Sequence, residues 1–131
     1  MPIHDEMQTL MDRWTKGFVE GDIDTCVDLY TKDATIFSPY SLPKRGRQAL
    51  RELFKDWYQQ GETNKCVTVE DAAADGSMAY CLVSYSGDYP QDDGSLITES
   101  GISLNVAAKQ RDGSWKLRMS SMNSDKPPLA S

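Results

Sequence analysis

The sequence predicts an α+β fold, in which an antiparallel sheet packs against helices that come first in the chain. Within the first 60 residues, apolar side chains recur every three or four positions, which is the spacing of amphipathic helices. From Lys65 onward apolar and polar residues alternate instead, as in half-buried strands, and three Asp-Gly pairs interrupt the alternation. A chain of 131 residues of which 39% are hydrophobic is long enough for one domain with its own core.

Three helices are predicted. The first carries an apolar stripe and ends at Gly21; the stripe is formed by Ile3, Met7, Leu10, Met11, Trp14 and Phe18. Asp22 is placed to cap a second, short helix, whose buried side carries Cys26, Val27 and Tyr30. The segment "RQALRELFKDWYQQG" predicts the third helix, which Gly61 ends, with one apolar face made of Leu50, Leu53, Phe54, Trp57 and Tyr58.

Strands account for most of the rest. A short strand at 34–37 precedes a loop that Pro39 and Pro43 bound. Four longer strands are expected near 65–73, 78–89, 95–110 and 115–123, with hairpin turns at the Asp-Gly pairs that start at Asp75, Asp93 and Asp112. The end, "SDKPPLAS", has two prolines and little to bury, so we expect a domain over 1–123 and a flexible tail over 124–131.

Composition excludes several classes of function. The net charge of -6 comes from scattered acidic residues, which argues against a nucleic-acid partner. No basic, apolar leader and no run of about 18 apolar residues is present, so we expect a cytoplasmic protein without a membrane span. The three cysteines, Cys26, Cys66 and Cys81, are expected to be reduced thiols. The only histidine is His4. We therefore expect no metal site, and nothing in the sequence calls for a cofactor.

The order of motifs adds a family resemblance. A helix, "GD", a short helix, "LYTKDATI", a proline loop, "GRQALRELFKDW" and a four-strand meander that ends in "RDGSWKL" follow one another. This arrangement resembles the nuclear-transport-factor-2-like superfamily (NTF2-like, cystatin-like α+β roll), in particular its SnoaL-like and ketosteroid-isomerase-like branch, over about residues 5–123. The resemblance implies a cone-shaped, curved sheet wrapped around three helices, with an apolar pocket inside.

The isomerases of that branch use carboxylates that this chain lacks at the matching positions. Ser38 stands where the general base is expected, and serine cannot act as a base near neutral pH. Trp14 matches the oxyanion-binding tyrosine, and Leu104 falls near the second aspartate. The resemblance therefore implies the isomerase's shape without its proton chemistry, and it leaves Ser38, Tyr40 and Tyr85 as the candidate catalytic groups.

The alternation of side chains along each strand predicts which of them face the pocket. By the resemblance, Cys81, Val83 and Tyr85 point inward, together with Trp14, Phe18, Phe37, Tyr40, Phe54 and Trp57 from elsewhere. For Phe18, Phe54 and Trp57, simple core packing explains the pattern equally well. The same parity turns Tyr80, Leu82 and Ser84 outward, and a face this apolar suggests a homodimer.

The same alternation applies to two further strands. On the last strand, Met119, Ser121 and Asn123 are expected on the same face as Leu117, which brings a hydroxyl and an amide to the interior. On the strand before it, we expect the apolar residues Ile102, Leu104 and Val106 to face the core. That alternation turns Glu99, Ser103 and Asn105 outward.

These observations predict a pocket protein for a small hydrophobic molecule. Its activity would be that of a cofactor-independent isomerase, cyclase, dehydratase or hydrolase that works by orientation and hydrogen bonding. Two alternatives remain open at this point. One is a non-catalytic binder, which the missing carboxylates favour, and the other is an association module that uses only the outer face of the sheet.

Overall fold

The computed structural model of the protein describes residues 2–126 and contains three helices: α1 (Ile3–Val19), α2 (Ile23–Asp28) and α3 (Arg47–Gln59). Gly21, which follows α1, has a φ of +75°, a conformation that glycine adopts readily. The Asp22 carboxylate accepts a hydrogen bond from the Thr25 N–H and so caps α2, as predicted. This helix ends at Asp28, so Tyr30 begins a strand instead of belonging to the helix.

Six strands form one curved, open sheet in the order β2-β1-β6-β5-β4-β3. They are β1 (Tyr30–Ser38), β2 (Ser41–Arg45), β3 (Thr63–Asp75), β4 (Met78–Pro90), β5 (Leu96–Lys109) and β6 (Trp115–Ser124). The four long strands lie within two residues of their predicted bounds. The expected proline loop is wrong, because residues 41–45 pair with β1 as a hairpin. Neighbouring strands are antiparallel except β1 and β6, which run parallel.

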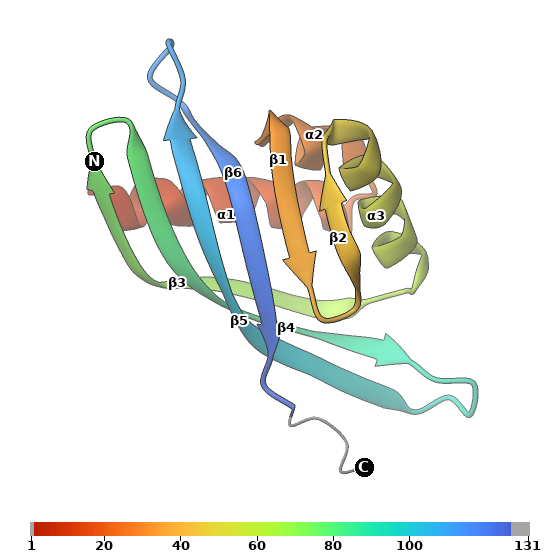
Figure 1. Ribbon diagram of the computed structural model, residues 1–131. Helices are drawn as coiled ribbons and strands as arrows, with labels where there is room; N and C mark the ends of the chain where they lie inside the picture. The colour runs from red at the N-terminus through yellow and green to blue at the C-terminus, as the bar shows by residue number, and fades with distance from the viewer. Residues whose placement is uncertain (1, 127–131) are drawn as a thin grey trace.

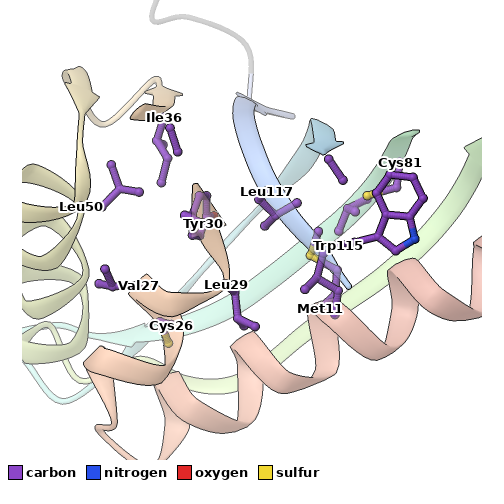
Figure 2. Packing of buried hydrophobic residues seen from close by; sticks show 14 of the residues in the cluster. Met11, Cys26, Val27, Leu29, Tyr30, Ile36, Leu50, Cys81, Trp115 and Leu117 are labelled. Carbon is purple, nitrogen blue, oxygen red and sulfur yellow. The ribbon is translucent and has the colours of Figure 1, made fainter. Parts of the chain in front are cut away.

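The helices fill the concave side of the sheet. In Figure 1 the long strands β3 to β6 bend around α1, while α2 and α3 stand beside β1 and β2. Figure 2 shows buried side chains from the helices and from the sheet in the space between them, among them Met11 from α1, Val27 from α2, Leu50 from α3 and Leu117 from β6. The predicted α+β architecture, a curved sheet wrapped around N-terminal helices, is therefore confirmed.

The faces of three strands decide what the interior contains. On β4 the prediction holds, since Cys81 and Val83 are buried and Tyr80 is exposed. On β5 it is wrong, because Ser103 and Asn105 are buried while Ile102 and Leu104 are each 46% exposed. The alternation is regular, but this strand turns its polar side inward.

A β-bulge reverses the faces of β6. The cross-strand partner of Ala107 is Leu117, whereas the partner of Val106 is Met119, so β6 contains one extra residue at this point. Beyond the bulge Ser120 is buried and Met119 is exposed. The prediction that Met119, Ser121 and Asn123 face the interior with Leu117 is therefore wrong.

Asp125 and Lys126, which follow β6, contact residues of β5. Ser124 is the last residue of β6, and the Asp125 N–H donates to the Ser100 carbonyl at 3.1 Å. The Lys126 Nζ donates to Glu99 Oε1 at 2.9 Å. The first residues of the segment expected as a flexible tail are thus held to the sheet, and 127–131 lie outside the described residues.

Candidate functional site

A cavity of about 530 Å³ lies between the helices and the concave side of the sheet. Residues of α1, α3, β1 and β3 to β6 line it, including six aromatic side chains: Trp14, Tyr30, Tyr40, Trp57, Tyr85 and Tyr89. Its volume falls within the range of small-molecule pockets, about 300–1,000 Å³. The cavity is therefore large enough for a molecule of several rings.

Four buried polar side chains form a hydrogen-bonded network in one wall. Ser120 Oγ donates to Asn105 Oδ1 at 2.6 Å, and Asn105 Nδ2 donates to Ser103 Oγ at 3.0 Å. The hydroxyl of Tyr30 lies 3.5 Å from Ser120 Oγ. Buried polar groups need such partners, and here they supply them to one another. Because Ser103 Oγ accepts its bond from Asn105, its own hydrogen remains available to a ligand.

Two phenols meet at the rim of the cavity. The Tyr40 and Tyr85 hydroxyl oxygens lie 3.1 Å apart. A β-carbon at Gly101, which faces Tyr85 across the strands, would lie only 2.6 Å from the Tyr85 hydroxyl, so glycine leaves room for this phenol. Burial and the hydrogen bond with Tyr40 raise the pKa of Tyr85. At neutral pH the Tyr85 phenol is thus protonated, so it can donate a hydrogen bond and does not act as a base.

A buried ion pair occupies another part of the wall. Lys65 Nζ lies 3.0 Å from Glu62 Oε1, and the two side chains are only 12% and 4% exposed. The same ammonium lies 5.3 Å from the ring centre of Trp14 and 5.1 Å from that of Phe18, which is cation–π distance. Glu62 packs over Gly87, where a β-carbon would collide with its carboxylate. Lys65 is therefore fully engaged by protein groups.

Glu99 also lines the cavity, so its predicted outward orientation is wrong. Its side chain is 31% exposed, and its partner Lys126 is 48% exposed. Tyr89 lines the same cavity, and its pKa is raised first by burial and then by the Glu62 carboxylate. The cavity wall consequently contains two carboxylates where the sequence suggested none.

The residues proposed from the sequence fall into four groups. Lining the cavity are Trp14, Tyr40, Trp57, Val83 and Tyr85. Three others, Phe18, Phe54 and Cys81, are buried in the core and do not line it. Phe37, Ser38 and Asn123 border a separate, more open depression, while Met119 is exposed and Ser121 lies on the same outward side of β6.

Two of these residues have structural roles. The Ser38 hydroxyl accepts a hydrogen bond from the Tyr40 N–H at 3.0 Å, which stabilises the turn between β1 and β2. Burial raises the pKa of the Cys81 thiol to about 12, so this cysteine is protonated and unreactive at neutral pH.

Most of the polar lining was not predicted from the sequence: Tyr30, Glu62, Lys65, Tyr89, Ser103, Asn105 and Ser120. One signal for part of it was present. Glycine inside a strand often marks the close approach of another group, and Gly87 and Gly101 mark the positions of Glu62 and Tyr85.

Solved structures share this architecture at low sequence identity. A ketosteroid isomerase-like protein from Erwinia carotovora atroseptica SCRI1043 superimposes with a TM-score of 0.82 at 15% identity, over 95% of this chain and 97% of that chain. A nuclear transport factor 2 (NTF2-like) superfamily protein from Salmonella enterica subsp. enterica serovar Typhimurium str. LT2 gives 0.79 at 12% identity, over 98% and 95%. A protein with a cystatin-like fold from Nostoc punctiforme gives 0.77 at 16% identity, over 95% and 91%.

Within residues 2–126, no helix is both long and apolar enough to cross a membrane.

At these identities the superpositions establish the fold alone, and the assignment to a family depends on the sequence. Residues 11–114 match the model of the SnoaL-like domain, which is well over half of the chain. The resemblance predicted from the motifs is therefore confirmed, and the chain belongs to the SnoaL-like family, with the NTF2-like fold.

Proposed function

We propose that the protein binds a small, largely apolar ring compound in the cavity and acts on it without a cofactor. The observation that supports this proposal is the 530 Å³ cavity itself, with aromatic rings over much of its wall and polar groups at a few fixed points. Such a lining recognises a flat, apolar body and fixes its orientation through one or two polar atoms. Membership of a small-molecule-binding family agrees with this reading.

Tyr40 and Tyr85 are the proposed catalytic residues. Their hydroxyls are within hydrogen-bond distance of each other, so when one donates to the other, the second hydrogen can be donated to a ligand oxygen. A phenol that donates such a hydrogen bond can stabilise the negative charge that develops on the ligand oxygen during an isomerisation, elimination or hydrolysis. Ser38 is not included, because it borders the separate depression and does not line the cavity.

Filling the cavity should weaken binding. Val67 is only partly buried and lines the cavity, so Val67→Trp adds bulk there without replacing a fully buried core residue. We expect this variant to bind the fluorescent apolar probe N-phenylnaphthylamine at least about tenfold more weakly than the wild type. The measurement is the rise in probe fluorescence on titration with protein.

Val19→Trp is the matched control, because Val19 is 61% exposed and does not line the cavity. It should bind the probe like the wild type. Equal binding by both variants and the wild type would show that the probe binds elsewhere and would refute the proposal. An enzyme is distinguished from a carrier by mass spectrometry of a tightly bound compound, since a carrier returns it chemically unchanged after long incubation.

A homodimer through the outer face of the sheet is a second proposal. Cross-strand pairing places Leu82 next to Leu104 and Val106 next to Met119, and Tyr80 and Ile102 extend the same apolar surface. Leu104 is 46% exposed and Met119 is 37% exposed in the single chain. Continuous apolar surface of this kind is typical of a face that another protein covers.

Charge on this surface should prevent the association. We expect wild-type protein to sediment as a dimer and Leu104→Lys to sediment as a monomer, because the interface would bury an unpaired ammonium. Leu42→Lys is the control, since Leu42 is 80% exposed on β2, away from the surface in question. Sedimentation velocity at several concentrations measures the oligomeric state of both variants. If Leu104→Lys sediments as a dimer, the proposed interface is refuted.

A further inference from the structure

The charges around the cavity suggest what kind of ligand it takes, an inference that rests on the proposed function above. Three ionisable side chains with a formal charge at neutral pH line the cavity: Glu62, Lys65 and Glu99. Lys65 is neutralised by Glu62 and lies against two aromatic rings, so this pair presents no net charge to a ligand. The charge that remains is the carboxylate of Glu99.

Glu99 has a partner that a ligand can replace. Lys126 Nζ reaches Glu99 Oε1 at 2.9 Å, but both side chains remain open to solvent, at 48% for the lysine and 31% for the glutamate. Ion pairs as exposed as this contribute little to stability. By contrast, the Glu62–Lys65 pair is nearly enclosed, and separating it would leave a buried charge. Glu99 is thus the carboxylate that can exchange its cation.

The surroundings of Glu99 favour a positive group. Tyr40, Tyr85 and Tyr89 line the same cavity, and aromatic faces attract ammonium groups. The carboxylates of Asp125 and Glu99 contribute, after burial and Tyr40, to raising the pKa of Tyr85, which reflects negative potential at this rim. Asp125 itself accepts a hydrogen bond from Ser100 Oγ. The net charge of -6 also attracts cations from a distance.

We propose that the cavity selects a ring compound that carries a protonated amine. Its ammonium takes the place of Lys126 at the Glu99 carboxylate, among the rings of Tyr40, Tyr85 and Tyr89, while its apolar body lies in the cavity. A neutral compound of the same shape binds more weakly, and a carboxylate is repelled by Glu99.

Three probes that share a ring system and differ in one group test the proposal: naphthylmethylamine, naphthylmethanol and naphthoate. Isothermal titration calorimetry at pH 7 and low salt should give the amine at least about tenfold tighter binding than the alcohol. Naphthoate should bind more weakly than the alcohol. The preference for the amine should shrink as salt is added, because Glu99 is partly exposed to solvent.

Two variants should change the preference in opposite directions. Glu99→Gln keeps the shape of the side chain and removes its charge, so amine and alcohol should bind it within about twofold of each other. Lys126→Gln removes the competing ammonium and should tighten amine binding by about two- to fivefold while leaving alcohol binding unchanged. Glu70→Gln is the control, because Glu70 is an exposed carboxylate that hydrogen-bonds Ser84 and does not line the cavity.

The outcomes separate the two proposals. If the alcohol binds the wild type as tightly as the amine, or if Lys126→Gln weakens amine binding, the selection of an amine is refuted while small-molecule binding stands. If none of the three probes binds, and N-phenylnaphthylamine also fails, both proposals are refuted.

Discussion

Replacing Phe54 by alanine should lower the free energy of unfolding by about 3–5 kcal/mol, the usual result of removing a large, fully buried aromatic ring. Phe54 is 0% exposed, and its ring centre lies 5.4 Å from that of Trp14 and 5.7 Å from those of Tyr30 and Trp57. These three rings line the cavity, so the void left by Phe54 adjoins the proposed site. Urea unfolding of the variant and the wild type measures the loss.

Phe37→Ala is the matched control, because it is the same substitution at a side chain that is 40% exposed. Its cost should stay below about 1 kcal/mol. The variant Phe54→Ala should also bind N-phenylnaphthylamine more weakly, since the wall formed by Trp14, Tyr30 and Trp57 loses its support. Equal destabilisation by the two substitutions would contradict the packing described above.

The contrast between these phenylalanines shows what the sequence could predict. Phe54 belongs to an apolar stripe of α3, and helical periodicity identified it as either core or pocket. Phe37 is assigned to the pocket by the family resemblance, because it adjoins Ser38, the position that matches the general base. In β1 the buried neighbours are Ala34 and Ile36, so alternation turns Phe37 outward. The long helices, the four long strands and the Asp-Gly turns between them were predictable because their signals are local.

The faces of β5 and β6 were not predictable by the same rules. Choosing the apolar side of β5 as the inner side assumes a solid core, whereas this sheet encloses a cavity with polar groups, Ser103 and Asn105, in its wall. On β6 a single extra residue beside Leu117 reverses every side chain beyond it, and no turn residue announces the bulge. The polar lining of the candidate site therefore became visible only with the tertiary structure.

The protein should lose stability steeply above about pH 9 because two buried thiols resist ionisation. Burial raises the pKa of Cys26 and of Cys81 to about 12, and both side chains are 0% exposed. In the unfolded chain a thiol has a pKa of about 8.5. Each folded pKa lies above the unfolded value, so the stabilisation is complete below about pH 8.5 and is lost as the pH rises towards 12.

Between pH 9 and pH 10.5 each thiol should remove about 1.4 kcal/mol of unfolding free energy per pH unit, or together about 4 kcal/mol over this interval. Urea unfolding at several pH values measures this slope. Cys26→Ala and Cys81→Ala should each remove about half of it, although both lower stability at pH 7 by leaving a small void. Cys66→Ala should leave the slope unchanged, because Cys66 is exposed. Burial also raises the pKa of Tyr30, Tyr85 and Tyr89 above the value of about 10 in the unfolded chain, so their ionisation adds a loss that begins near pH 9 and grows above pH 10. Cys26→Ala and Cys81→Ala retain this tyrosine contribution, so an unaltered slope between pH 9 and pH 10 in both variants would mean that the thiols are not sequestered as the fold requires.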